Sequence, residues 1–405
     1  GVLQPVSPYL TSIDKQAAIE LVMELIAIPG GPGDETAVAA RIKADLIKNG
    51  FATRNIRHDK ANRHTRCPSP TGNMIACLPG RGKLRNAARR LLSTHMDTVP
   101  LCLGAVPLRK SKNRIVPAGN TALGGDNRSG CASILTAIRE LHSSGCDHPP
   151  LTLLFTVQEE VGLSGTQHLD ASLLRSPQLA INVDGGSPAD LVIGAIGGRQ
   201  WQADIHGIAA HAGCHPEDGA SASNVFAIAH ATLVADGWHG KVEQGRNRCT
   251  ANIGSLGGGD ATNVVMDRLQ VTGECRSHSK SFLDRMMRTY ENAFTKAAKQ
   301  TKNASGQCAG VEFKVTNAYP SFTMSKRHPS VSAVVDALAV TRRRPNFRVI
   351  DGGLDANCLT AIHGIPSVTI GAGDHSPHTV NEYLDVPEYL DACRVLLQFA
   401  TGPKG

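Results

Sequence analysis

Residues 91–101, LLSTHMDTVPL, place a histidine and an aspartate at the end of an apolar run. A short apolar run that stops at polar residues is typical of a buried strand. His95 and Asp97 are two residues apart, so on extended backbone their side chains would point to the same side. Asp97 could then accept a hydrogen bond from the imidazole nitrogen that a metal ion on His95 leaves free. A histidine beside a charged residue in an ordinary loop is the alternative, because this pair alone is a weak signal.

Other short apolar runs surround this stretch and alternate with helical patterns. The runs are NMIACLPG (73–80), LTLLFTVQEE (151–160) and QLAINVDGG (178–186), and the helical stretches are SIDKQAAIELVMELIAIPG (12–30), DETAVAARIKADLIKNG (34–50) and SGCASILTAIRELHSSG (129–145). Such alternation predicts an α/β domain built around a buried, mostly parallel sheet.

The pattern changes near residue 197. RQWQADIHGIAAHAG (199–213) alternates like a half-exposed strand, and helical and strand-like stretches with half-exposed faces follow it as far as GVEFKVTNAY (310–319). After that, apolar runs such as IPSVTIGAG (365–373) return to the earlier pattern. We therefore predict an α/β domain in two parts, residues 1–196 and 318–405, interrupted by a smaller α+β domain at 197–317.

Length and charge restrict the class of partner. A chain of 405 residues is longer than one core usually supports. The net charge of +7 is spread along the chain, and the one dense basic cluster, TRRRPNF (341–347), is interpreted as a solvated helix end. No run approaches the roughly 18 apolar residues of a membrane span. We expect neither a nucleic acid nor a membrane as a partner.

The cysteines indicate a reducing environment. There are 11 of them, an odd number, and none forms a C-x-x-C pair. This pattern favours free thiols over a disulfide framework. The first residues, GVLQPVSPYLTSIDKQ, show no basic stretch followed by an apolar one, so no secretory signal is expected. A cytoplasmic location is the resulting prediction.

Carboxylates follow two of the predicted strands. Glu159 and Glu160 end LTLLFTVQEE, and Asp184 follows AINV. Ligands of open α/β sheets bind outside the carboxyl ends of the strands, so these groups could meet. Two adjacent carboxylates repel each other, which favours a surface turn unless a metal ion compensates them. Because neighbouring residues of a strand point to opposite sides, one could bind the metal while the other acts as a general base.

Two further stretches carry metal-ligating side chains. Asp126 lies in LGGDNRSG (123–130), which is either a plain turn or a constrained loop whose carboxylate bridges two cations. HSPHTVNEYLDV (375–386) supplies His375 and His378, of which one could be a ligand and the other a surface histidine.

Together these motifs resemble the M20 metallopeptidases, and among them the peptidase T-like di-zinc aminopeptidases. The resemblance rests on STHMDTVP (93–100), GGDNRSGCASIL (124–135), TVQEEVGLSG (156–165), NVDGG (182–186), GIAAHAGCHPEDGASA (207–222), GGGDATNVVMD (257–267), GECRSHS (273–279) and HSPHTVNEYL (375–384). They occur in the family's order over nearly the whole chain, and they are specific only as a set. The resemblance implies a zinc-exopeptidase-like catalytic domain interrupted by a smaller lid domain.

The resemblance also implies the ligands of two zinc ions, or of cobalt or manganese in their place. His95, Asp126 and Asp184 would bind one ion. Asp126, Glu160 and His378 would bind the other, so Asp126 would bridge them. His378 is preferred to His375 because it precedes TVNEYL as the family ligand does.

Five further roles are implied. Asp97 would orient a ligand and Glu159 would be the general base. In the lid, His211 would stabilise the oxyanion, often from a neighbouring subunit, while Asn263 and Arg276 would hold the substrate backbone or its terminal carboxylate. A lid-surface histidine and a strand-surface arginine are the alternatives for His211 and Arg276.

Some positions depart from the family pattern. Cys275 stands where relatives commonly have alanine, and Arg128 where lysine is common. Both substitutions are compatible with the family fold.

The expected function is that of a di-zinc exopeptidase that hydrolyses the N-terminal bond of short peptides as a homodimer formed through the lid. In the family, the ligand at the position of Asp184 tends to be aspartate in aminopeptidases and glutamate in carboxypeptidases and deacylases. A carboxypeptidase or N-acyl amino acid deacylase is the first alternative. A non-catalytic peptide-binding protein is the second, although retention of Glu159 and all apparent ligands speaks against it.

Overall fold

The computed structural model describes residues 12–402. Most of the N-terminal stretch in which no secretory signal was expected lies outside this range. The chain forms two compact units. The α/β unit comprises the chain up to Gly194, Thr323–Ile350 and the chain from Leu354 on; the inserted unit comprises Ala195–Phe322 and Asp351–Gly353. The insertion expected at 197–317 lies within the second range.

A nine-stranded sheet forms the centre of the α/β unit, in the order β1-β2-β6-β3-β7-β16-β8-β14 with β15 beside β8. Its strands are β1 (Ile56–His58), β2 (Met74–Leu78), β3 (Arg90–His95), β6 (Leu151–Thr156), β7 (Leu179–Val183), β8 (Asp190–Ala195), β14 (Phe322–Thr323), β15 (Asn346–Ile350) and β16 (Ser367–Ile370). The four central strands β6, β3, β7 and β16 are parallel. Strand β1 pairs antiparallel with β2, β2 with β6, and β8 with β16. The α/β fold is confirmed, but the sheet is mixed. The sequence did not predict the antiparallel strands, because an apolar run indicates that a strand is buried but not in which direction it runs.

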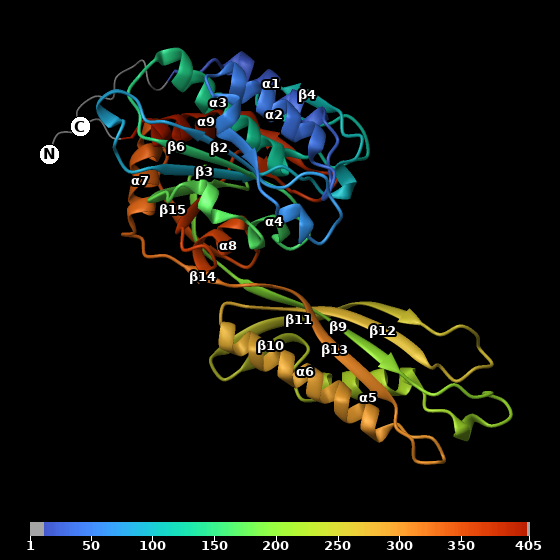
Figure 1. Cartoon of the computed structure of the whole chain (residues 1–405). Coiled ribbons are helices and arrows are strands. Elements are labelled where there is room, and N and C mark those ends of the chain that lie inside the picture. The colour runs from blue at the N-terminus through green and yellow to red at the C-terminus, as the bar shows by residue number, and fades with distance from the viewer. Residues whose placement is uncertain (1–11, 403–405) are drawn as a thin grey trace. The chain divides into compact units, whose positions relative to one another are not determined.

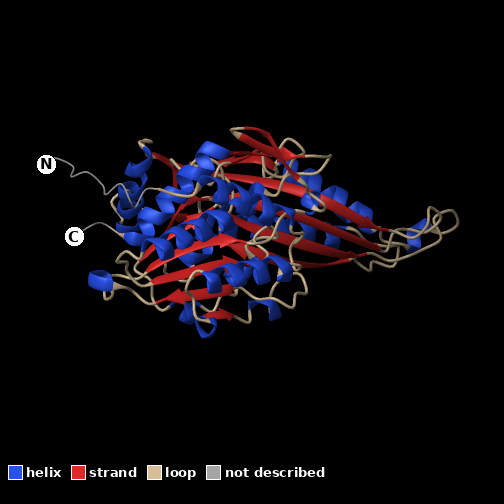
Figure 2. Cartoon of the chain, turned by 90° about the horizontal axis from the view of Figure 1, so that it is seen from above, coloured by secondary structure: helices blue, strands red, loops and turns tan. Residues whose placement is uncertain are grey.

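Helices cover both faces of this sheet (Figure 1). They are α1 (Lys15–Ala27), α2 (Thr36–Lys48), α3 (Gly125–Ser144), α4 (Ser164–Gln167), α7 (Pro329–Leu338), α8 (Asp355–Ala361) and α9 (Val386–Thr401). In Figure 1, α1, α2, α3 and α9 lie on one side of the sheet and α4 and α8 on the other, and Figure 2 shows helices layered over the strands. Helix α1 begins at Asp14, whose carboxylate accepts a 3.0 Å hydrogen bond from the Ala17 amide, a standard N-cap.

A small second sheet belongs to the same unit. It runs in the order β17-β18-β5-β4, with β4 at Pro107–Ser111, β5 at Arg114–Pro117, β17 at Asp374–His375 and β18 at Tyr383–Asp385. The β4–β5 hairpin and helix α9 were not among the expected elements. This sheet connects the segment between β3 and α3 to the segment after β16, which carries His378.

The inserted unit is a five-stranded antiparallel sheet with two helices on one face (Figure 1). Its elements are β9 (Gly197–His206), α5 (Ala222–Ala235), β10 (Gly240–Gln244), β11 (Asn247–Gly258), β12 (Arg268–Ser277), α6 (Lys280–Gln300) and β13 (Gly310–Tyr319). Strand β9 alternates as expected, with Trp201, Ala203 and Ile205 buried in the core. Trp201 packs against Tyr290 and Phe294 of α6, at ring-centroid distances of 5.2 and 5.8 Å.

One sheet edge of the inserted unit is only partly covered. Strand β10 pairs with residues 247–251 of β11, whereas residues 252–258 have no strand partner on their outer side within the described chain. This free segment contains three glycines and the exposed Leu256. An unpaired edge of this kind is a template for adding another strand.

No helix within residues 12–402 is long and apolar enough to cross a membrane.

Candidate metal centre

Three parallel strands bring predicted site residues to one edge of the large sheet. His95 is the last residue of β3 and lies opposite Thr156, the last residue of β6. Glu159 and Glu160 follow β6, and Asp184 follows β7, where its amide donates 2.8 Å to the Ile370 carbonyl. The carboxyl ends of the strands therefore converge as the sequence predicted.

Asp126 lies between the two histidines. Its Oδ1 is 3.0 Å from His95 Nε2, and its Oδ2 is 3.1 Å from His378 Nε2. His378 Nε2 is also 3.0 Å from Glu160 Oε1, and His95 Nε2 is 4.0 Å from Asp184 Oδ2. A carboxylate with one oxygen toward each imidazole has the arrangement needed to bridge two cations.

The ligand atoms form two overlapping groups. One consists of His95, Asp126 and Glu160, and the other of His95, Glu159 and Asp184; within each group the atoms lie within 4.8 Å of one another. The second group contains Glu159, which the sequence analysis assigned as the base. His378 contacts two members of the first group, Asp126 and Glu160.

Asp97 contacts His95 in a different way from that expected. Strand β3 ends at His95, and the Nδ1 of His95 donates to the backbone carbonyl of Asp97 at 3.0 Å, while the carboxylate Oδ1 is 3.4 Å away. This bond leaves Nε2 of His95 as the ligand nitrogen. The two carboxylate oxygens of Asp97 instead accept the amides of Glu159 (3.0 Å) and Glu160 (3.1 Å).

Glu159 and Glu160 lie in a turn, so the expectation that strand pleating separates them is wrong. Strand β6 ends at Thr156, and Gln158 has a left-handed φ of 54°. Non-glycine residues adopt this conformation when their surroundings impose it, often at functional sites. The turn, rather than the pleat, directs the two carboxylates into the site.

Glu382 was missed as a site residue. It is buried, its Oε2 accepts the amides of Leu123 (2.6 Å) and Gly124 (2.9 Å), and its Oε1 accepts the amide of Asp126 (3.1 Å). Three donors thus fix the glycine-rich loop that presents Asp126. The motif HTVNEYL contains this glutamate, but no local pattern reveals a contact across 256 positions.

Arg128, the departure from the family's lysine, is a buried structural cation. Its guanidinium donates to the carbonyls of Met96 (2.8 Å), Leu25 (2.6 Å), Ile28 (2.8 Å) and Gly30 (3.2 Å). These bonds join the end of α1 to the segment between His95 and Asp97. A fork-shaped donor suits this set of carbonyls better than a single ammonium would.

The two C-terminal histidines have separate surroundings. His375 forms an ion pair with Glu388 and stacks on Tyr383 at 5.1 Å. His378 has a left-handed φ of 62° and lies against Asp126 and Glu160. The geometry favours His378 as the ligand.

The three predicted lid residues lie in the inserted unit. His211 and Asn263 are neighbours, since the Ala212 amide donates to the Asn263 carbonyl at 2.9 Å. Both are exposed. Arg276 lies at the other end of β12, and its guanidinium forms a two-point ion pair with Glu274 at 2.9 and 3.0 Å.

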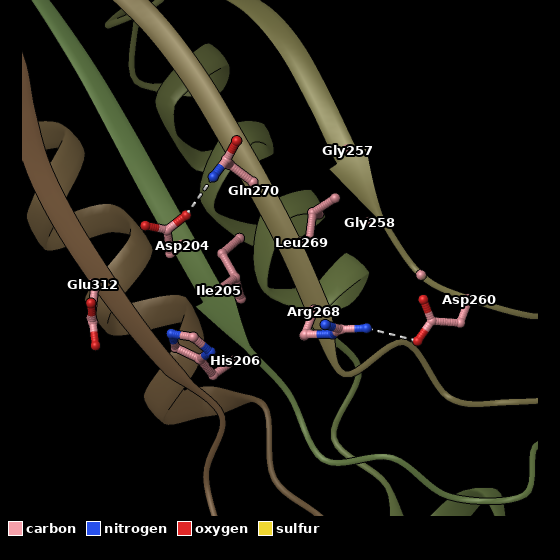
Figure 3. A pocket seen from close by; sticks show the side chains of 11 residues that line it. Asp204, Ile205, His206, Gly257, Gly258, Asp260, Arg268, Leu269, Gln270 and Glu312 are labelled. Atoms are coloured by element: carbon pink, nitrogen blue, oxygen red, sulfur yellow. Dashed lines mark hydrogen bonds and ion pairs between the residues drawn. The ribbon is translucent and has the colours of Figure 1, made fainter.

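A pocket of about 480 Å³ lies on the sheet of the inserted unit (Figure 3). Its lining includes Asp204, His206, Arg268, Gln270 and Glu312, none of which was predicted as a site residue. The guanidinium of Arg268 is paired with Asp260 at 2.9 Å (Figure 3). The cluster of metal-ligating atoms in the α/β unit is therefore a better candidate for a reaction centre than this pocket is.

Electrostatics in the α/β unit call for added positive charge. Burial, together with neighbouring carboxylates, raises the pKa of Glu159 and Asp184 well above their ordinary values. Hydrogen bonds to Asp126 and Glu160 raise the pKa of His378 to about 10. In the metal-free protein, protons on these side chains thus neutralise negative charge that divalent cations would neutralise in the metal-loaded protein. The oxygen and imidazole donors fit divalent metal ions such as zinc.

Comparisons with known proteins agree with this geometry. Residues 91–402 match the family model for peptidase family M20/M25/M40. The chain is 29% identical to the crystal structure of aminopeptidase PepT from Bacillus cereus, with a TM-score of 0.78 over 96% of this chain and 98% of that one. A tripeptidase from Staphylococcus aureus is 26% identical over the same shares, with a TM-score of 0.82. A probable carboxypeptidase of Aspergillus terreus is 30% identical over 78% of this chain and 71% of its own length.

The raised pKa values predict a pH dependence of stability in the metal-free protein. The folded state holds a proton on His378 up to about pH 10, against an ordinary value of 6.5. Its stabilising contribution is therefore complete below the ordinary pKa and is lost as the pH rises toward 10. The raised pKa values of Glu159 and Asp184 act in the same direction. We expect the melting temperature in chelator to fall between about pH 6 and pH 9.

Thermal denaturation with chelator and with added zinc tests this. The metal-loaded protein should lose less stability, because cations replace the protons, and His378→Ala should flatten the slope in chelator. A melting temperature that rises with pH in chelator would contradict the prediction.

Proposed function

The chain belongs to peptidase family M20/M25/M40 and is a peptidase T-like peptide-bond hydrolase, and on that premise we propose that it is a di-zinc exopeptidase that removes the N-terminal residue of short peptides. The observation that carries the proposal is the position of Asp126, with one carboxylate oxygen toward His95 and the other toward His378.

The proposed metal ligands follow from these contacts. His95, Asp126 and Asp184 would hold one zinc ion, and Asp126, Glu160 and His378 would hold the second. The ions would supply Lewis acidity at the scissile carbonyl and at the attacking water. Cobalt or manganese would suit the same oxygen and nitrogen donors.

Glu159 is proposed as the general base. It is buried beside the ligands, and its backbone is held by Asp97. Burial raises its pKa above the ordinary value of a glutamate, which makes the carboxylate a stronger base. Glu159 would take a proton from water as the new C–O bond forms, and would give it to the leaving amine as the peptide C–N bond breaks.

Removal of the base without loss of the metals is the direct test of this assignment. Glu159→Gln keeps the size of the side chain and leaves the proposed ligand set intact. We expect turnover of a short peptide to fall about 10²- to 10⁴-fold while metal content stays at the wild-type level. Steady-state kinetics and elemental analysis measure both quantities.

His95→Ala and His378→Ala are the comparison variants. Both should lose metal as well as rate. Full metal occupancy in these two proteins, or near-normal turnover in Glu159→Gln, would show that the residues have been misassigned.

Action at the amino end is supported by Asp184 and by the similarity to an aminopeptidase and a tripeptidase. Arg276 would hold the far carboxylate of a short substrate, which would limit its length. Glu274 occupies the Nε and one terminal nitrogen of Arg276 and leaves the other terminal nitrogen for a substrate. The similarity to a probable carboxypeptidase favours the alternative, a carboxypeptidase or N-acyl amino acid deacylase.

Mass spectrometry of reaction products separates these alternatives. We expect a free tripeptide to lose its first residue, and its N-acetylated form to react far more slowly, because the site for the free amine would be left unpaired. The C-terminal amide should react more slowly through loss of the carboxylate contact. Release of the C-terminal residue from the acetylated peptide would support the carboxypeptidase alternative. A lack of hydrolysis of all three peptides would support the peptide-binding alternative.

A homodimer is proposed because His211 and Arg276 lie at opposite ends of the inserted unit. Arg276 pairs with Gly198 and Arg268 with His206, so about 26 Å of strand separates the two ends at roughly 3.3 Å per residue. A tripeptide spans only about 10 Å. One inserted unit therefore could not place both residues on the same tripeptide, and a second subunit would have to supply His211. The free edge of β11 offers a place for the two subunits to meet.

Subunit exchange tests the homodimer. His211→Ala and Glu159→Gln should each be nearly inactive alone, and their mixture should recover some activity, since mixed dimers contain one intact composite site. Activity assays after incubation, with the mass in solution measured by light scattering, provide the readout. A wild-type protein that is active as a monomer would exclude the shared site.

A reducing cytoplasm is the proposed location, which agrees with all eleven cysteines being free thiols.

A further inference from the structure

Glu35 is a buried carboxylate outside the proposed ligand set. It precedes helix α2, but its side chain makes no capping hydrogen bond to that helix. Its Oε1 accepts the amides of Gly33 at 3.1 Å and of Gln158 at 3.0 Å. Its Oε2 is buried and has no hydrogen-bond partner in the described part of the chain. The side chain therefore reaches away from its own helix toward the turn that follows β6.

That turn is held by carboxylates at three consecutive amides. Glu35 accepts from Gln158, and the two oxygens of Asp97 accept from Glu159 and Glu160. Charge-assisted bonds of this kind are stronger and more directional than those to a neutral acceptor. The direction of the Glu159 side chain thus depends on two acids that are 62 positions apart in sequence.

Gln158 needs such restraint because its backbone is left-handed, with φ at 54°. Its side chain is also fixed, accepting from the Cys67 amide (2.9 Å) and donating to Thr65 Oγ1 (3.0 Å) and the Cys67 carbonyl (2.9 Å). A non-glycine residue relaxes toward common φ values unless its contacts prevent it. The Glu35 contact is the one that holds the backbone amide of Gln158 itself.

The surroundings of Glu35 disfavour the charged form of its carboxyl group. Burial, with Asp97 nearby, raises its pKa to about 7. A buried carboxyl group with one oxygen unbonded lowers the stability of the fold unless its other hydrogen bonds offset that cost. Acids of this kind at active sites commonly serve the chemistry.

We propose that Glu35 is a positioning residue that fixes the Gln158 turn and thereby directs Glu159 at the reacting atoms. The proposal rests on the function proposed above. Glu35 itself would contact neither substrate nor metal.

Amide hydrogen exchange and kinetics of Glu35→Ala test the proposal together. In chelated protein, exchange in the peptide that contains residues 157–163 should be at least about 10-fold faster, since the Gln158 amide loses its acceptor. In the metal-loaded enzyme, kcat for a tripeptide should fall about 10- to 100-fold with KM changed by less than about 3-fold, because the base is displaced and binding is not. Glu35→Gln retains an acceptor oxygen and should recover most of the rate.

Asp14→Ala is the matched control. It removes an acidic residue that begins α1 and accepts the Ala17 amide, but it has no contact with residues 158–160. It should lower the melting temperature without changing either readout. If Glu35→Ala does not fold, Glu35→Asp replaces it, since the shorter side chain withdraws the carboxylate from Gln158 and should lower kcat.

Three outcomes would overturn the proposal: unchanged exchange at residues 157–163, unchanged kcat, or equal losses in Asp14→Ala. If the wild-type enzyme cleaves no peptide, the proposed function fails instead. Exchange would then still decide whether Glu35 holds the turn.

Discussion

Mutual repulsion among buried carboxylates is the constraint on which the α/β unit depends. Asp126, Glu159, Glu160 and Asp184 meet within a few ångströms at the edge of the sheet. Such a group is stable only if protons or cations neutralise it and if backbone donors fix its members. The imidazoles meet the first requirement in the metal-free state, and divalent ions would meet it in the active one. The fold meets the second by bringing distant segments against the site.

Those supports come from every part of the α/β unit. Asp97 holds the turn after β6, Glu382 holds the loop before α3, and Arg128 ties the end of α1 to the segment after β3. Each of these three side chains is buried and bonds to backbone groups, so each fixes the position of a backbone segment in addition to contributing charge. Loss of any one support would shift ligands that it does not touch. The large sheet therefore supports the candidate site at the carboxyl ends of its strands.

The sequence predicted the α/β class, an interruption near residue 197 and candidate metal-ligating side chains at the ends of β3, β6 and β7. These features follow from local patterns of burial and from the rule that ligands gather at strand ends. It did not predict the antiparallel outer strands, because burial does not encode direction. It also missed Glu382 and Glu35, whose roles arise from contacts across 256 and 123 positions. Asp97 contacts His95 as predicted, but through its backbone carbonyl instead of its carboxylate, because β3 ends at His95 and does not extend to Asp97.

The core of the inserted unit has an optical consequence. The chain contains only two tryptophans, and both Trp201 and Trp238 belong to this unit. Trp201 is buried among aromatic rings, while Trp238 lies beneath the guanidinium of Arg285 at 4.9 Å. Tryptophan fluorescence therefore comes from the inserted unit alone, and the α/β unit with its candidate metal centre contains no tryptophan. Intrinsic tryptophan fluorescence can therefore report on changes in the inserted unit without an added label.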